Sequence, residues 1–316
     1  KAFADKGMDW KKQLELFYPG ATLERALLPD GTWFILKTVD AARDITVAIT
    51  RDGTVREIEL WRAGVLDRLP SGLSHAVMDT WQEGESDVIA MRDLTGSMLG
   101  WDSVLDRATL RGIFAAATGM HRAMRDERSP HLMSFEERVS LFSRRVVSPL
   151  AGHPTGLPQG ILEGWDRFGH LVPPEVSDLV FRIHDDPTVI TRPLAEARLT
   201  MIHGDLWVNN IALEPNRVTL IDWALATRAS PILEFVSFLA GCADQVDASH
   251  DEVIEDIRWA MGEDFPAGAL PTALVMGLVE MGWNLALQVT EGEASRAAES
   301  LDWWVGRARE AIVRGL

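Results

Sequence analysis

The sequence has little cysteine and no long apolar run. Its 316 residues contain a single cysteine, Cys242, which excludes a disulfide within this sequence and fits a reducing compartment. No uninterrupted apolar stretch reaches the roughly 18 residues of a membrane-spanning helix. The stretch that begins at Lys1 lacks the apolar core of a signal peptide. These absences predict a cytoplasmic protein without a membrane segment.

Positive charge is also scarce. The chain has 31 Lys and Arg against 47 Asp and Glu, a formal net charge of −16. Nucleic acids and anionic membranes reward basic surfaces, so neither is an expected partner. The acidity favours a cationic small-molecule ligand, or it serves solubility alone. Composition leaves the oligomeric state open.

The most informative stretch runs from Met201 to Trp223 and has the sequence MIHGDLWVNNIALEPNRVTLIDW. Asp205 and Asn210 fall in a predicted loop, and Asp222 lies near the end of a predicted strand, Arg217 to Trp223. A turn containing proline separates that strand from an earlier apolar run. Such a hairpin can bring two carboxylates and a carboxamide together. Their oxygens suit Mg²⁺, with one carboxylate left to accept a proton.

This pattern resembles the aminoglycoside phosphotransferase and choline kinase family, which is related to the protein kinases. The family hallmark is His-Gly-Asp, an Asn later in the same loop, and Ile-Asp-Trp or Ile-Asp-Phe after a hairpin. Here these are His203-Gly204-Asp205, Asn210 and Ile221-Asp222-Trp223. The resemblance implies transfer of the ATP γ-phosphoryl group to a small-molecule hydroxyl. It makes Asp205 the catalytic residue, and Asn210 and Asp222 the Mg²⁺ ligands.

The resemblance also implies an α+β fold with two lobes, like that of the protein kinases. Residues 1–94 would form a small lobe with an antiparallel sheet and one helix, which binds the nucleotide. Residues 95–316 would form a larger, mainly helical lobe with the catalytic loop and the acceptor site. Hydrophobic periodicity agrees with this division, because strand patterns precede Asp102 and helical patterns follow it.

In the small lobe, Thr22–Leu28 and Trp33–Val39 have the pattern of two strands joined by the turn Pro29-Asp30-Gly31-Thr32. Lys37 lies among apolar residues of the second strand, where an unpaired ammonium would be costly. The resemblance implies that Lys37 reaches the nucleotide phosphates and pairs with a glutamate on a helix. The alternative is an edge-strand lysine that faces water.

The predicted partner of Lys37 is Glu57, with Glu59 as the second choice, on a helix over Arg56–Leu69. A competing interpretation is a capping box, in which Glu57 bonds back to the backbone of Thr54.

The other nucleotide contacts rest on the resemblance, because the sequence contains neither Gly-x-Gly-x-x-Gly nor a Walker A pattern. A turn over Pro19–Thr22 would cover the phosphates, with its backbone N–H groups or the Thr22 hydroxyl as donors. The hinge would lie at Arg92–Gly96, and its backbone near Arg92 and Leu94 would meet the base. Relatives usually carry an acidic residue where this chain has Arg92, so ATP is expected and GTP stays possible.

The larger lobe shows helical periodicity throughout. Glu234 replaces an aspartate that braces the catalytic loop in relatives, so this brace would be longer or absent. Glu280 and Asp302, beside tryptophans near the end of the chain, are candidates for contacting a polyhydroxylated or amine acceptor. The stretch Asp44–Thr50 is predicted to be a strand. Helices are predicted at Ser103–Met124, Phe135–Val147, Ile161–Phe168, Ser230–Leu239, Asp251–Met261, Leu270–Val289 and Ala294–Val313.

Two alternative functions remain. A metallophosphoesterase would need a histidine directly after the Asn, and Ile211 stands there instead. A nucleotide-binding pseudokinase or regulatory protein without phosphotransfer is the second alternative, because Arg92 and Glu234 depart from the family pattern.

Overall fold

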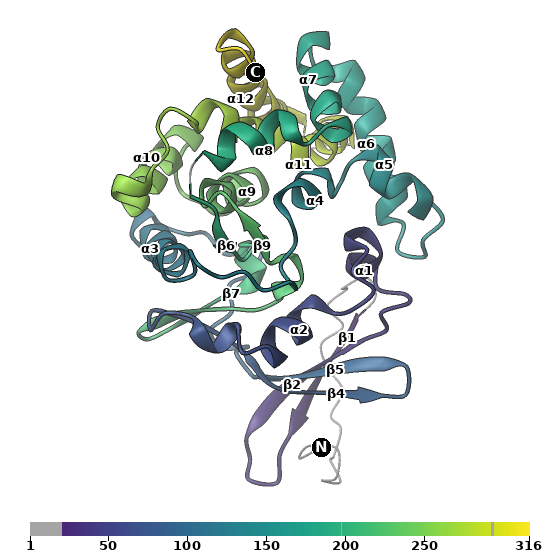
Figure 1. The fold of residues 1–316 in the computed structure, drawn as a ribbon, viewed down its shortest axis with the longest axis vertical. Coiled ribbons are helices and arrows are strands. Elements are labelled where there is room, and N and C mark those ends of the chain that lie inside the picture. The colour runs from purple at the N-terminus through teal and green to yellow at the C-terminus, as the bar shows by residue number, and fades with distance from the viewer. Residues whose placement is uncertain (1–20, 197, 292–293) are drawn as a thin grey trace.

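The chain folds into a sheet-containing lobe and a larger helical lobe, as predicted. The structure is a computed structural model that describes residues 21–196, 198–291 and 294–316 (Figure 1). The predicted turn over Pro19–Thr22 therefore lies outside the described residues, except at its end. In Figure 1 the four-stranded sheet lies at the bottom and the helices of the larger lobe lie above it.

The sheet of the small lobe has the strand order β1-β2-β5-β4, and all neighbouring strands are antiparallel. Because β2 is an inner strand, between β1 and β5, the interpretation of Lys37 as an edge-strand residue is wrong. The strands are β1 (Ala21–Leu27), β2 (Trp33–Val39), β4 (Val77–Glu83) and β5 (Ser86–Arg92).

Two helices follow β2. The predicted strand at Asp44–Thr50 is wrong: Ile45–Thr50 is helix α1, and the Asp44 side chain caps it by accepting a hydrogen bond from the Val47 amide at 2.9 Å. An N-cap of this kind satisfies an unpaired amide and outweighs the strand preference of the β-branched residues. Helix α2 covers Arg56–Arg62, shorter than predicted, because Gly64 takes a positive φ of 65° and ends it.

A second sheet joins the two lobes. Strand β3 (Leu73–His75) belongs to the chain between α2 and β4, and it pairs in parallel with β8 (Arg217–Leu220). β8 forms the predicted hairpin with β7 (Ile211–Glu214). A shorter pair, β6 (Thr200–Ile202) with β9 (Thr227–Ala229), brackets this hairpin in the sequence.

The larger lobe is mainly helical, with boundaries that differ from the predicted ones. Asp106 caps the first helix, so it begins after the predicted start at Ser103. The predicted helix over Phe135–Val147 is two helices, because Ser143 caps a new one. The helices are α3 (Arg107–Ala123), α4 (Phe135–Ser140), α5 (Arg144–Val147), α6 (Leu157–Leu171), α7 (Pro174–Asp185), α8 (Thr188–Ala195), α9 (Ile232–Cys242), α10 (His250–Met261), α11 (Leu270–Glu291) and α12 (Ala294–Val313).

Helix α11 lies at the centre of the larger lobe. Its 22 residues include a window with mean hydropathy 1.3, which satisfies the length and composition of a membrane-spanning helix. However, 67% of that window is buried inside the fold, where α11 packs against α6, α9 and α12. Burial against other helices accounts for its apolar composition.

Candidate active site

The loop after β6 is shaped by Gly204. This residue has φ +81°, and a Cβ added there would lie 2.0 Å from the Leu225 carbonyl oxygen, so only glycine fits. Its neighbour His203 is buried, with Nε2 3.0 Å from the Ile221 carbonyl oxygen and the ring packed on Trp223. Burial lowers the pKa of His203, which keeps the ring neutral. His203 therefore links the loop to the end of the β7–β8 hairpin.

Glu234 of α9 holds the same loop from below. Its carboxylate is fully buried and accepts hydrogen bonds from the backbone amides of His203, at 2.6 Å, and Gly204, at 2.9 Å. His121 Nε2 lies 3.3 Å from the same carboxylate. Burial alone would raise the pKa of Glu234, but the hydrogen bond with His121 and neighbouring contacts lower it. The brace that the sequence left in doubt is present.

Arg138 and Glu280 support the loop from the other side. The Arg138 guanidinium donates to the Gly204 carbonyl oxygen at 3.0 Å, and its Nη1 lies 3.1 Å from Glu280 Oε1. Ser237 donates to the second Glu280 oxygen at 2.6 Å. Glu280 is 4% exposed, so the prediction that it contacts an acceptor is wrong. Asp302 is exposed on α12, and no contact within the described chain connects it to this loop.

Asp205 and Asn210 face each other across the loop. Asn210 Nδ2 donates to Asp205 Oδ2 at 2.8 Å and to the Asp205 carbonyl oxygen at 2.9 Å. Burial, reinforced by the nearby charge of Asp222, raises the pKa of Asp205 to about 7. A carboxylate with this pKa can accept a proton near neutral pH. Asn210 Oδ1 is buried and has no hydrogen-bond partner among the described residues.

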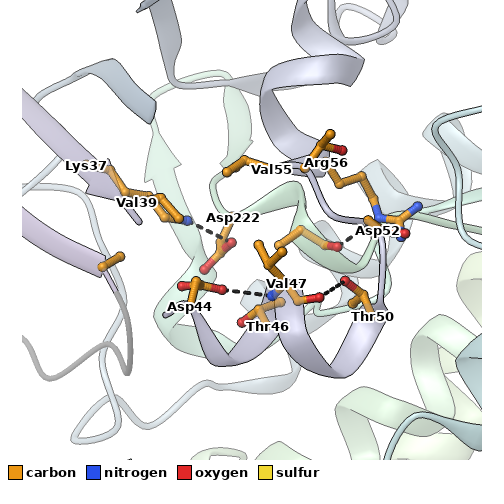
Figure 2. Close-up of a pocket in the computed structure, with 13 residues that line it drawn as sticks. Lys37, Val39, Asp44, Thr46, Val47, Thr50, Asp52, Val55, Arg56 and Asp222 are labelled. Atoms are coloured by element: carbon orange, nitrogen blue, oxygen red, sulfur yellow. Dashed lines mark hydrogen bonds and ion pairs between the residues drawn. The ribbon is translucent and has the colours of Figure 1, made fainter. Parts of the chain in front are cut away.

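Asp222 follows β8 in a left-handed conformation, with φ 61° and ψ 69°. Few residues other than glycine adopt this conformation, and where they do the strain often marks a functional position. The conformation directs the carboxylate to Lys37, whose Nζ lies 2.9 Å from Asp222 Oδ1 (Figure 2). Burial acts to raise the pKa of Asp222, but the Lys37 ammonium outweighs it and lowers that pKa.

Lys37 also pairs with Glu57, at 3.4 Å. Val55, not Thr54, caps α2 and makes no side-chain cap bond, so the capping-box interpretation is wrong. The second-choice partner is also wrong, because Glu59 pairs with Arg62 at 3.6 Å. Burial raises the pKa of Glu57 despite the Lys37 charge.

The sequence did not identify Asp44 as part of this cluster. Asp44 is 7% exposed and lines a pocket with Lys37 and Asp222 (Figure 2). Burial raises its pKa, and its charge interacts with both of those residues. Aspartate is a preferred N-cap residue, so the position of Asp44 directly before Ile45 could have predicted a helix there. The predicted strand over Asp44–Thr50 excluded that interpretation.

The residues present fit a Mg²⁺ ion bound with a nucleotide. Asn210 offers an unpartnered oxygen and Asp222 a carboxylate. Within the described ranges no three His, Cys, Asp or Glu side chains form a metal site by themselves. Two protein ligands are enough where phosphate and water oxygens supply the others, as is usual for Mg²⁺.

The predicted side-chain contact from Thr22 is wrong. Thr22 pairs with Thr38 in the sheet, whereas Ala21 and Val39 line the pocket beside Lys37. Because side chains alternate along a strand, Thr22 points to the opposite face.

The two hinge residues are partly engaged within the protein. The Arg92 guanidinium binds both Glu214 oxygens, at 3.0 and 3.2 Å, and its amide donates to the Ala76 carbonyl oxygen. Leu94 is buried, and its carbonyl oxygen accepts from the Ser97 and Met98 amides. Only the remaining backbone groups of Arg92 and Leu94 are available to bind the nucleobase of a nucleotide.

Known proteins resemble this chain in sequence pattern and fold. A sequence model described as "Phosphotransferase enzyme family" matches residues 82–265, which is more than half of the chain. A search among curated proteins found no match to this chain. The GDP complex of a mutant aminoglycoside 2'-phosphotransferase-IIIa has 13% identity and a TM-score of 0.60, covering 98% of this chain and 96% of that one.

Two further solved structures share the fold. Aminoglycoside phosphotransferase APH(3'')-Id from Streptomyces rimosus, with ADP and streptomycin, has 16% identity and a TM-score of 0.53 over 88% of this chain and 94% of that one. Macrolide 2'-phosphotransferase MphH from Brachybacterium faecium has 13% identity and a TM-score of 0.52 over 96% and 94%. At these identities the likeness shows the two-lobed kinase-like fold. The match to the family model shows more: the chain belongs to the phosphotransferase enzyme family.

Proposed function

We propose that this protein transfers the γ-phosphoryl group of ATP to a hydroxyl of a small molecule. The observation that carries the proposal is that Lys37, Asp222, Asn210 and Asp205 lie together in one site. Their side chains provide the functional groups that the reaction needs. Phosphoryl transfer depends mostly on positioning and on cationic stabilisation of the phosphate oxygens. These four side chains provide a cation, two oxygen ligands and a base.

Asp205 acts as the base in this proposal. Its pKa of about 7 lets it orient the acceptor hydroxyl and take the proton as the new O–P bond forms. Asn210 holds the Asp205 carboxylate in place through its Nδ2, at 2.8 Å, and keeps its Oδ1 available.

Asp222, Asn210 and Lys37 form the phosphate side of the site. Asp222 and Asn210 would hold Mg²⁺, which neutralises charge on the nucleotide phosphates when bound. Lys37, fixed by Glu57, would contact the same phosphates. Asp222 is now the closer partner of Lys37, at 2.9 Å against 3.4 Å for Glu57. A bound metal would compete with the ammonium for this carboxylate.

Ligands in the similar structures support nucleotide use. These structures include complexes with GDP or ADP, and amicoumacin kinase hAmiN carries AMP-PNP and Ca²⁺. Kanamycin and streptomycin occur in two of them, which supports a small-molecule acceptor here. The choice between ATP and GTP depends on the hinge backbone near Leu94, and both nucleotides are part of the test.

The second candidate is a pseudokinase that binds nucleotide without transfer. The departures at Arg92 and Glu234 motivated it, but Glu234 makes both backbone hydrogen bonds of the brace. This contact favours a working enzyme over a pseudokinase.

The experiment is Mg²⁺-dependent ADP or GDP release from ATP or GTP, measured with a panel of small-molecule alcohols. Asp205→Asn should lower kcat by about 100-fold or more, because a positioned base contributes on that scale. Nucleotide affinity should change little, because Asp205 supplies neither the cation nor a metal ligand, and an asparagine oxygen can still accept the hydrogen bond from Asn210. Retained turnover in Asp205→Asn would remove Asp205 as the base, and absent nucleotide binding in the unmodified protein would remove the whole proposal.

A further inference from the structure

A pocket of about 300 Å³ lies where the end of α9, the second half of α11 and the start of α12 meet. We call it the acceptor pocket. Small residues make the space on the α9 side, and polar and aromatic side chains cover the other sides. Those used below are Gly241, His250, Asn284, Gln288, Ser300 and Trp303.

The acceptor pocket adjoins the support of the catalytic loop. Ser237 on α9 and Glu280 on α11 meet in the hydrogen bond beneath Gly204. Gly241 and Asn284 each follow four residues later, one helical turn of about 5.4 Å along the same helices. Both residues line the pocket. The pocket therefore begins one turn beyond the contact that holds the loop.

Trp207 connects the pocket to Asp205. This residue belongs to the catalytic loop, where its amide donates to the Asp205 carbonyl oxygen at 2.8 Å. Its indole ring covers Gly241, so closely that a Cβ at Gly241 would lie 2.7 Å from the ring. Trp207 therefore contacts both the wall of the pocket at Gly241 and the backbone of Asp205.

The uncharged polar groups in the pocket have no hydrogen-bond partners within the described chain. Asn284, Gln288 and Ser300 form no side-chain hydrogen bond with any residue that the structure describes. His250 stacks on Trp303, with ring centroids 4.6 Å apart, and His250 Nε2 and Trp303 Nε1 are buried without partners in the described chain. Buried polar groups normally have partners, so His250 Nε2 and Trp303 Nε1 are suited to bind a ligand. Asn284 is half-buried and Gln288 is exposed, so their amides can contact the same ligand.

The charge of the pocket does not suit a polycation. Its carboxylates are Asp244, which pairs with Arg296 at 3.1 Å, and Glu299. Glu280, the acidic residue expected to bind an amine, is committed to Arg138 inside the protein. One uncompensated carboxylate cannot balance several ammonium groups. Amides, a hydroxyl and aromatic rings instead match hydroxyl groups and the apolar faces of sugar rings.

We propose that the acceptor pocket binds the body of a neutral, polyhydroxylated acceptor such as a glycoside, and that this molecule presents one hydroxyl to Asp205. The inference rests on the proposed function. The acceptor oxygen forms a bond to the γ-phosphorus while the bond from that phosphorus to the β-phosphate oxygen breaks. The hydroxyl proton passes to Asp205, and ADP leaves.

Two variants and a matched control test the inference. Asn284→Leu and Gln288→Met keep the size of each side chain and remove its amide. Gln82→Met makes the same change on β4, at an exposed position in the other lobe. We expect each pocket variant to raise the KM of neutral glycosides about tenfold, the loss of one hydrogen bond, with the KM of ATP and kcat nearly unchanged. The control should match the unmodified protein.

The acceptor panel decides the chemical class. It contains methyl glucoside, maltose, lactose and maltotriose as neutral members, and kanamycin, streptomycin and choline as cationic members. Higher kcat/KM for the cationic members, or no change of glycoside KM in the pocket variants, would overturn the inference.

Failure of the proposed function gives a different result. Quenching of tryptophan fluorescence by the same neutral sugars reports binding without phosphotransfer. Sugar binding that is weakened by Gln288→Met, with no ADP release, supports the pocket and contradicts the kinase proposal. If no neutral sugar quenches the fluorescence and none is phosphorylated, the assignment of the pocket is overturned, whether or not the protein binds a nucleotide.

Discussion

The polar groups of the catalytic cluster and those of the acceptor pocket differ in whether they have partners within the protein. Around Asp205 and Asp222, almost every charged group has a fixed partner, as the contacts of Lys37 and Glu234 show. Around Asn284 and Gln288, the described polar groups are mostly neutral and without partners. Pairing fixes geometry before any ligand arrives, which phosphoryl transfer needs. Groups without a partner in the protein are available to form hydrogen bonds with a ligand.

The largest effect is expected from breaking the phosphate side. Asp222→Asn keeps the left-handed backbone and an oxygen for Lys37, because asparagine tolerates positive φ. It removes one charge, so Mg²⁺-ATP affinity should fall about 100-fold, since a partly buried charge contact contributes several kcal/mol. Isothermal titration with Mg²⁺ and with EDTA measures this difference. Equal losses in both conditions would show that Asp222 does not act through the metal.

A change of pH tests the catalytic cluster without mutation. Because the pKa of Asp205 is about 7, kcat/KM should fall about tenfold for each pH unit below 7. Once protonated, the Asp205 carboxyl cannot take the proton of the substrate hydroxyl. Binding of a neutral sugar to the acceptor pocket should change little over the same range, since the amides there do not titrate. A flat kcat/KM profile between pH 5 and about 8 would contradict the role of Asp205.

The same residue predicts a gain in stability. The folded-state pKa of Asp205 is raised above its ordinary value of 3.8, so its favourable contribution is present below about pH 4 and is lost as pH rises through 7. Asp205→Asn removes the cost of a buried carboxylate. Its free energy of unfolding should exceed that of the unmodified protein above pH 7, and the two should converge below pH 4. Denaturant titrations at pH 4 and 8 measure both values, and a pH-independent difference would contradict this origin.

The smallest effect is expected at the brace. Glu234→Gln leaves one of the two backbone amides of His203 and Gly204 facing an NH₂ group, at a cost of about 1–3 kcal/mol in unfolding free energy. We expect a several-fold lower kcat and an unchanged KM for ATP. Glu255→Gln, at a side chain 72% exposed, is the matched control. Equal stability of the two variants would show that the brace is dispensable.

The sequence predicted the parts of the site that are encoded locally. The hairpin that carries Asn210 and Asp222 and the strand that carries Lys37 depend on turn residues and alternation within a few positions. The pairing of Lys37 with Glu57 followed from the family resemblance, because nothing local connects residues on different elements. The two-lobed division followed from the same resemblance, and the change of periodicity agreed with it.

The failures share a physical cause. Asp44 was assigned to a strand because β-branched residues follow it, although one capping hydrogen bond decided for a helix. Glu280 was predicted to contact an acceptor because it lies beside tryptophans, but it is buried against Arg138, which lies far away in the sequence. The acceptor pocket combines residues of four helices, α9, α10, α11 and α12, whose packing no periodic pattern encodes. Tertiary partners, rather than local propensity, determine these features.

The pairing of β3 with β8 has a consequence for motion. Strand β3 is part of the small-lobe segment and β8 belongs to the hairpin that carries Asp222, and the ion pair of Arg92 with Glu214 lies on the same side. These contacts connect the two lobes along the hinge edge. If the lobes rotate about this edge, displacement grows with distance from it. On the opposite side, Ile45 and Ile49 of α1 pack against Met133 and Val146 of the larger lobe, so an opening of the lobes about this edge would have to break that contact (Figure 1).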